Sequence, residues 1–326
     1  MQIVLDTRGL HFSVRNKCFF IEAESESRII HPSRVSSILI TAPCRISSPA
    51  IVMAAECEIP VIICNNYGKP EARIWSPHFI NISTLRRKQY QYCMEGRAMQ
   101  WAELIVLRKI EGQKSNLVYM ADRKPSLTED VQKALDEIAY QTYFVATWKS
   151  KQEISFKKKL MFLEAFTAGR YWPLIGQKLP VPWRFITRVK RNPSDPFNCS
   201  INYLYGMLKN QTETSVLGMG LDPALGIIHR DGYKMPSLVF DLMEPFRPLV
   251  DRMLVDEILQ DNFGFDILEK TGKEILISKQ GRKVLIALFN EWVKSRIKYS
   301  GTVTNVQNHI LTEARYLKKR IDDLRL

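Results

Sequence analysis

The pattern of hydrophobic and polar residues changes near residue 82 of the chain. Before that point, short apolar, β-branched or aromatic runs are separated by turn residues, which is typical of strands. The predicted strands are Gln2–Asp6, Leu10–Val14, Cys18–Ala23, Val35–Thr41, Pro60–Asn65 and Ala72–Trp75. One helix is predicted over Ser47–Glu58, because Ser47 or Ser48 can cap it and Pro49 suits its first turn. The pattern predicts a compact, mainly β domain over residues 1–80.

From Ser83 onward, apolar residues recur every three or four positions, which is the spacing of helices with one buried face. The predicted helices are Leu85–Ile110, Thr128–Lys149, Ser155–Leu174, Pro196–Met219, Leu238–Gln260, Arg282–Lys298 and a last one starting at Thr304. Trp75–Ser83 is the predicted linker. We therefore expect an α+β protein, with a small β-rich N-terminal domain followed by a larger all-helical domain over residues 84–326.

Composition adds a strong positive charge to this picture. The 326 residues include 47 Lys and Arg against 34 Asp and Glu, a net charge of +13, which favours polyanionic partners without identifying them. The six cysteines form no CxxC pair, which argues against a zinc knuckle or a disulfide framework and favours reduced thiols in the cytoplasm. The chain begins without a signal-peptide layout and has no apolar run of membrane-spanning length, so we expect no membrane partner.

The basic residues are concentrated between Trp148 and Arg191, where eleven Lys or Arg face only two Glu. Aromatic residues lie among them: Phe156, Tyr171, Trp172, Trp183 and Phe185. Basic side chains can neutralise phosphates and aromatic rings can stack on bases, so this segment is predicted to contact nucleic acid. The alternative is an ordinary solvated helix face.

A second concentration of chemistry lies in Leu221–Arg247. His229 is one of only five histidines, and Asp241 and Glu244 are three residues apart, so they share one face if the segment is helical. Carboxylate oxygens with one imidazole nitrogen and no thiolate suit Mg²⁺ or Mn²⁺ better than structural zinc. The alternative is a structural histidine beside two carboxylates that complement a helix dipole. In so basic a chain, a divalent-metal site suggests work on phosphodiesters.

Four segments, taken in order, resemble the motifs of one protein family. They are LMFLEAFTAGRYW (Leu160–Trp172), RVKRNPSDPFNCSINYLYGML (Arg188–Leu208), GMGLDPALGIIH (Gly218–His229) and PSLVFDLMEPFRPLVDR (Pro236–Arg252). Together they are similar to the integrase family of CRISPR spacer acquisition, CRISPR-associated protein one. The β-rich N-terminal part also fits this family. Residues 110–150 match it only in helical character.

The resemblance implies roles for individual residues. Glu164, His229 and Glu244 correspond to metal ligands for Mg²⁺ or Mn²⁺, and Asp241 to a further catalytic acidic residue that orients, ligates or acts as a base. Glu213 does not correspond to the first ligand, because its neighbours do not match the motif. The expected DNA contacts are Arg170, Arg184, Arg188, Arg191 and Arg247. Asn198, Asn202, Tyr203 and Tyr205 are expected to serve mostly as structural ties, and Asp222–Pro223 to end a helix before His229.

The same resemblance implies a metal-dependent DNA endonuclease and integrase, which inserts short fragments into a CRISPR array by 3′-hydroxyl transesterification. Its expected partners are double-stranded and branched DNA, a second copy bound through the N-terminal domain, and a small ferredoxin-like CRISPR-associated companion protein. Two alternatives stay open. One is a stand-alone structure-specific nuclease acting on branched DNA in repair. The other is a catalytically inactive nucleic-acid-binding scaffold.

Overall fold

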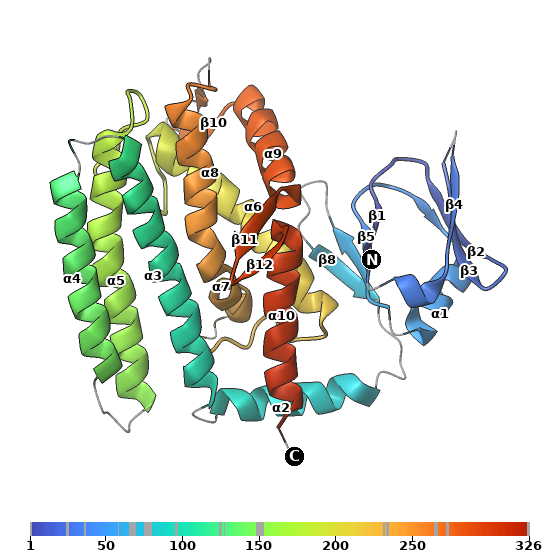
Figure 1. Cartoon of the computed structure of the whole chain (residues 1–326). Coiled ribbons are helices and arrows are strands. Elements are labelled where there is room, and N and C mark those ends of the chain that lie inside the picture. The colour runs from blue at the N-terminus through green and yellow to red at the C-terminus, as the bar shows by residue number, and fades with distance from the viewer. Residues whose placement is uncertain are drawn as a thin grey trace.

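The computed structural model has strands gathered in the N-terminal part and long helices in the rest of the chain (Figure 1). This confirms the α+β class predicted from the residue pattern. The residues that the structure describes are 2–23, 26–35, 37–57, 59–64, 70–74, 80–94, 97–123, 126, 128–147, 153–230, 232, 235–263, 267–271 and 274–324. The predicted linker Trp75–Ser83 falls mostly outside them, and helix α2 begins at Ile80.

Eight strands form two four-stranded sheets in the N-terminal part. The first sheet has the order β1-β5-β7-β8, with three parallel strands and an antiparallel β8, and consists of β1 Gln2–Leu5, β5 Ser37–Ile40, β7 Val61–Cys64 and β8 Pro70–Ile74. The second has the order β4-β3-β2-β6 and consists of β4 Ser27–Ile30, β3 Cys18–Glu22, β2 His11–Arg15 and β6 Arg45–Ile46. All six predicted strands are present, whereas β4 and β6 were not predicted.

Local residue chemistry explains two connections in this part. Asn16 and Lys17 join β2 to β3 and both have positive φ, 51° and 57°, which is the backbone twist that a two-residue hairpin turn requires. Helix α1, Ser48–Glu56, begins as predicted: the Ser47 side chain accepts a hydrogen bond from the Ala50 N–H, and Pro49 lies in the first turn. The buried faces of both sheets and of α1 share one hydrophobic cluster.

The second part is mainly rather than entirely helical. Its helices are α2 Ile80–Met94, α3 Arg97–Arg123, α4 Thr128–Thr147, α5 Glu153–Lys178, α6 Pro196–Gly218, α7 Ser237–Met243, α8 Arg247–Leu259, α9 Lys279–Lys294 and α10 Val306–Asp322. Short 3₁₀ turns cover Pro32–Arg34 in the first part and Glu244–Phe246 here. Two hairpins that the pattern did not predict are β9 Leu268–Thr271 with β10 Glu274–Ile277, and β11 Arg296–Tyr299 with β12 Thr302–Asn305.

Three predicted helices differ from the observed ones. The predicted helix over Leu85–Ile110 spans parts of both α2 and α3. The one over Leu238–Gln260 consists of α7, a 3₁₀ turn and α8, because Pro245 and Pro248 lack the N–H groups that a continuous helix needs. The one over Arg282–Lys298 is too long, because α9 ends at Lys294 and the chain continues as strand β11.

Helix α3 occupies the centre of the helical part and positions the site. It packs against α5, α4, α8 and the 3₁₀ turn at Glu244–Phe246, and α4, α5 and α3 lie side by side in Figure 1. Its buried face includes Trp101, Ile105 and Ile110, each with no exposed surface. Within the described ranges, none of the helices combines the length and the apolar character needed to cross a bilayer.

Candidate metal and nucleic-acid site

The buried face of α3 contains three polar residues among its apolar ones. Lys109, Gln113 and Asn116 are 9%, 2% and 7% exposed. Lys109 and Gln113 line a cavity of about 410 Å³, whose other walls come from α5, α6, α7, α8, the 3₁₀ turn and the segments before α6 and α7. Glu164 of α5, Glu244 of the 3₁₀ turn and His229 all line this cavity. His229 and Glu164 are 65 positions apart along the chain, yet both line the same cavity as Glu244.

Positive groups surround the two glutamates. The Lys109 Nζ atom lies 2.5 Å from Glu164 Oε1 and 2.6 Å from Glu244 Oε2. The Arg247 Nε atom lies 2.8 Å from Glu244 Oε1. Burial by itself raises the pKa of Glu244, but the charges of Arg247 and Lys109 outweigh it and bring the pKa down to about 2. Glu244 is therefore ionised at any physiological pH, although its side chain is only 4% exposed.

His229 is held by Asp241, which lies on α7 with no exposed surface. The Nδ1 atom of His229 lies 2.6 Å from Asp241 Oδ1. The hydrogen bond to Asp241 raises the pKa of His229 against the opposing effect of burial, and the charges of Asp241, Glu244 and Glu164 raise it further. With Nδ1 engaged, Nε2 is the ring nitrogen left for a ligand.

The donor set fits a hard divalent cation. Two carboxylates and one imidazole are ligands that Mg²⁺ and Mn²⁺ accept, and a histidine whose second nitrogen bonds a carboxylate is the usual arrangement around protein-bound metals. Across the residues described here, no three His, Cys, Asp or Glu side chains are close enough to hold an ion as they stand. Lys109 lies between the two glutamates in this structure, so metal binding requires a local rearrangement around its ammonium group.

A second polar network borders the cavity and was not predicted. Asp251 of α8 has a fully buried side chain and accepts hydrogen bonds from Tyr205 Oη at 2.5 Å and Tyr171 Oη at 3.1 Å. Asn116 donates to Tyr171 Oη at 2.9 Å. Burial raises the pKa of Asp251 to about 6, although the two tyrosines, Arg188 and Arg247 lower it. The face of Tyr205 lies under Arg247, 4.6 Å from the guanidinium carbon, which links this network to the pair of Arg247 and Glu244.

Comparison with known proteins identifies the family. The model for "CRISPR associated protein Cas1" matches residues 3–291. The chain belongs to the Cas1 family. The CRISPR-associated endonuclease Cas1 of Korarchaeum cryptofilum is 29% identical over 261 residues, 77% of this chain and 76% of that protein.

Solved structures of other proteins share the fold. A casposase bound to its integration product superposes with a TM-score of 0.77 at 20% identity, covering 98% of this chain and 95% of that one. A chain of a partial Cas6-RT-Cas1–Cas2 complex gives a TM-score of 0.77 at 21% identity, covering 99% and 96%. At these identities the likeness shows that this Cas1-family chain has the same fold.

The predicted DNA-contacting arginines lie in different settings. Arg188 and Arg247 line the cavity. Arg184 and Arg191 are exposed in the segment between α5 and α6. Arg170 is exposed on α5, but its guanidinium pairs with Glu137 of α4 and stacks on Phe166. The structure therefore does not gather all five on one cavity wall.

The expectation that aromatic residues of the basic segment stack on bases is wrong for four of them. Tyr171, Trp172, Trp183 and Phe185 are 0%, 9%, 6% and 7% exposed. Phe185 stacks on Phe197 with ring centroids 4.4 Å apart, and Trp183 packs on Phe263 at 4.8 Å. Removing the apolar surface of these rings from water lowers the free energy of the folded state. The rings therefore form a core that holds the segment in place.

The asparagines of the second motif are structural ties, as predicted. Asn198, with no exposed surface, donates to the Thr187 carbonyl and accepts from the Val189 N–H and from Arg188. Asn202 accepts from Arg188 and donates to the Val189 carbonyl. Helix α6 thus fixes the segment that carries Arg188 and Lys190 to the cavity wall. Tyr205 bonds Asp251, as described above.

The structure also places Glu213 and the predicted helix end at Asp222–Pro223. Glu213 lies on α6 and pairs with Lys209 at 3.6 Å, and it is not one of the residues that line the cavity of Glu164 and Glu244. Helix α6 ends at Gly218, and Asp222 Oδ1 then accepts a hydrogen bond from the Ala224 N–H. Gln89 of α2 bonds both the N–H and the carbonyl of Asp222. These hydrogen bonds fix the direction of the backbone that leads to His229.

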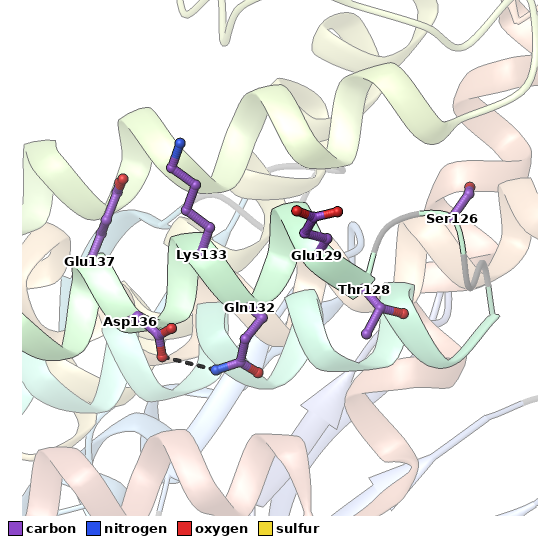
Figure 2. Close-up of a pocket in the computed structure, with 7 residues that line it drawn as sticks. All are labelled: Ser126, Thr128, Glu129, Gln132, Lys133, Asp136 and Glu137. Carbon is purple, nitrogen blue, oxygen red and sulfur yellow. Dashed lines mark hydrogen bonds between the residues drawn. The ribbon is translucent and has the colours of Figure 1, made fainter.

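A larger hollow of about 800 Å³ lies along the start of α4 (Figure 2). It is an open surface lined by Ser126, Thr128, Glu129, Gln132, Lys133, Asp136 and Glu137. The one hydrogen bond drawn among these side chains joins Gln132 to Asp136 at 2.9 Å. The hollow has no imidazole or thiolate and is remote in sequence from the family motifs. Size alone therefore does not mark the site.

Proposed function

We propose that this chain is a metal-dependent DNA endonuclease and integrase, which joins the 3′-hydroxyl of a short DNA fragment to a CRISPR array. The observation that carries the proposal is the convergence of Glu164, Glu244 and His229, from three separate parts of the chain, on one cavity with basic walls. Membership of the Cas1 family and the relatives named as endonucleases support it.

The proposed ligands are Glu164, Glu244 and the Nε2 atom of His229, and they would hold Mg²⁺ or Mn²⁺. A bound ion would supply charge neutralisation at the phosphate and activation of the attacking hydroxyl. In the joining step the 3′-oxygen forms a bond to phosphorus, and the bond to the oxygen of the cut strand breaks. One phosphodiester replaces another, so the step needs no external energy source.

The chain's own groups would position the substrate around these ligands. Arg188, Lys190 and Lys209 line the cavity with Arg247, and they would neutralise DNA phosphates as the backbone enters. Asp241 would act through His229, because it is completely buried and, within the described residues, its carboxylate bonds the segment that carries the imidazole. We assign Asp241 a positioning role in place of direct contact with the metal or the DNA.

The proposed partners are double-stranded and branched DNA, a second copy of the chain through the N-terminal domain, and a small ferredoxin-like companion. Two active sites would be needed because both ends of a fragment must be joined. The casposase bound to an integration product and the Cas1–Cas2 complexes among the structural neighbours support DNA and a companion protein as partners.

The test is a joining assay with a labelled short duplex and a supercoiled plasmid that carries a repeat, with and without the companion, in Mg²⁺ or Mn²⁺. Wild type should transfer the label, and Glu164→Gln and His229→Ala should not. Glu213→Gln is the matched control, because Glu213 is a partly buried glutamate paired with Lys209 outside the ligand set. Cleavage without transfer would favour the repair nuclease. Binding without chemistry in either metal would favour the scaffold.

A further inference from the structure

Lys109 occupies a position that neither metal ligation nor DNA contact explains. It is a lysine on the buried face of α3, beside Ile105, Val106 and Ile110, which have at most 1% of their surface exposed. Lysine is rarely buried to this extent unless it is paired. Its ammonium group points between two carboxylates from other elements, Glu164 and Glu244.

The two glutamates need a cation in order to be so close. Like charges in a buried site repel each other strongly, and one ammonium that contacts both removes most of that cost. Lys109 Nζ is within 2.6 Å of an oxygen on each side. A divalent ion bound by both carboxylates would need the same space, since its bonds to oxygen are about 2.0–2.2 Å long.

We propose that Lys109 is an internal counter-cation for the Glu164–Glu244 pair, which a divalent metal must displace in order to bind. The inference rests on the ligand assignment in the proposed function. Lys109 then stabilises the metal-free protein and weakens its affinity for the metal.

A place for the displaced ammonium exists on the same helix. Gln113 lies one turn further along the buried face of α3, lines the same cavity, and has its Oε1 atom buried. Throughout the described part of the chain, this oxygen finds no hydrogen-bond donor. Side chains four residues apart on a helix are neighbours, so the Lys109 ammonium can reach Gln113 by a change of rotamer. Such an unsatisfied buried acceptor is uncommon and fits a group that gains its partner in the metal-bound state.

The experiment measures Mn²⁺ binding to the full-length, metal-stripped protein, by titration calorimetry and by the spin-resonance signal of free Mn²⁺. Lys109→Met keeps the length of the apolar stem and removes the charge. It should bind Mn²⁺ about tenfold more tightly than wild type, because the ion no longer competes with an ammonium group. Its melting temperature without metal should be lower, and the rise in melting temperature on adding Mn²⁺ should be larger.

Three further variants make the outcome decisive. Lys114→Met is the matched control on the same helix, where Lys114 pairs with Glu111 at 2.9 Å, and it should leave the Mn²⁺ affinity unchanged within about twofold. Lys109→Gln repeats the test with a polar side chain if Lys109→Met does not fold. Glu164→Gln reports whether Mn²⁺ binds at this site at all.

An equal or weaker Mn²⁺ affinity in both Lys109 variants overturns the counter-cation role and leaves the proposed function standing. If wild type and Glu164→Gln bind Mn²⁺ alike, the ligand assignment fails, and the proposed function fails with it.

Discussion

The carboxylate of Asp241 bonds both the ring and the backbone of His229. Its Oδ1 atom lies 2.6 Å from the imidazole Nδ1 and 3.0 Å from the His229 backbone nitrogen. Its Oδ2 atom accepts from the backbone N–H groups of Ile227 and Ile228, at 2.6 and 2.9 Å. One buried side chain therefore sets the path of the chain and the orientation of the ring together, and it engages Nδ1 rather than Nε2.

We expect Asp241→Asn to weaken Mn²⁺ binding by about 10–100-fold, which is the usual effect of losing a carboxylate behind a metal-bound histidine. The variant replaces one acceptor oxygen with an NH₂ group that faces N–H donors, so the free energy of unfolding should also fall by about 1–3 kcal/mol. Titration calorimetry with Mn²⁺ and chemical denaturation measure the two effects. Glu257→Gln is the control and should change neither quantity, because within the described residues the Glu257 carboxylate accepts a hydrogen bond from Asn262 alone. Unchanged Mn²⁺ affinity in Asp241→Asn would contradict the positioning role.

Sequence patterns predicted the parts of this fold that local chemistry determines. The six predicted strands and the capped helix α1 follow from alternation, turn residues and Ser47. The break after α7 was also locally encoded, by Pro245 and Pro248, but the predicted helix over Leu238–Gln260 ran through both prolines. The motifs brought Glu164, His229 and Glu244 to attention, and the structure places all three on one cavity.

Long-range pairings escaped prediction because no local pattern carries them. Lys109 lies in the segment IVLRKIEGQ, where a lysine is normally assigned to the solvent face of a helix. The three polar residues at positions 109, 113 and 116 interrupt an otherwise apolar helix face, which indicates buried polar contacts. This pattern does not identify the partners of those contacts. Asp251 and Tyr205 are 46 residues apart and belong to different helices. The burial of the rings near Trp183 could not be predicted, because composition alone does not distinguish a core aromatic residue from an exposed one.

Asp251 predicts a specific pH dependence of stability. Burial raises its pKa from 3.8 to about 6 in the folded protein, so the folded state holds the proton more tightly than the unfolded state does. The stabilising contribution of this proton is complete below pH 3.8 and is lost as the pH rises through about 6. Relative to Asp251→Asn, wild type should lose about 2 kcal/mol of unfolding free energy between pH 4 and pH 7.

Urea denaturation of both proteins across this pH range tests the prediction, because subtraction removes the titration of all other shared groups. Parallel curves would mean that Asp251 has the same proton affinity in the folded and unfolded chains. A difference of opposite sign would mean that the cations Arg188 and Arg247 dominate over burial at Asp251.

Asn198 is expected to be a major source of stability in the segment before α6. Its amide makes contacts with Thr187, Val189, Arg188 and Asp195, and it has no exposed surface. Asn198→Ala leaves several buried polar groups without partners, so the free energy of unfolding should fall by about 2–4 kcal/mol. Asn262→Ala, at an exposed position, should change it by less than about 0.5 kcal/mol. Denaturant midpoints measure both, and equal values for the two variants would contradict the role of Asn198.

The arginines outside the cavity should contribute unequally to DNA binding. Arg184 and Arg191 are exposed, and no salt bridge engages either one within the described residues, whereas Arg170 is already paired with Glu137. A phosphate must compete with that carboxylate for Arg170, but it meets Arg184 and Arg191 without an acidic competitor. We expect Arg184→Ala and Arg191→Ala each to reduce the slope of log affinity against log salt by about one unit, and Arg170→Ala to change it little.

Fluorescence anisotropy with a labelled duplex, repeated over a series of NaCl concentrations, measures these slopes. Glu137→Gln tests the reason for this difference, because it removes the carboxylate that pairs with Arg170. In that background, Arg170→Ala should also reduce the slope of log affinity against log salt. Equal slopes for all three single variants in the wild-type background would mean that the Arg170–Glu137 pair opens when DNA binds. Flat salt dependence of wild type itself would mean that the basic segment does not meet the phosphates at all.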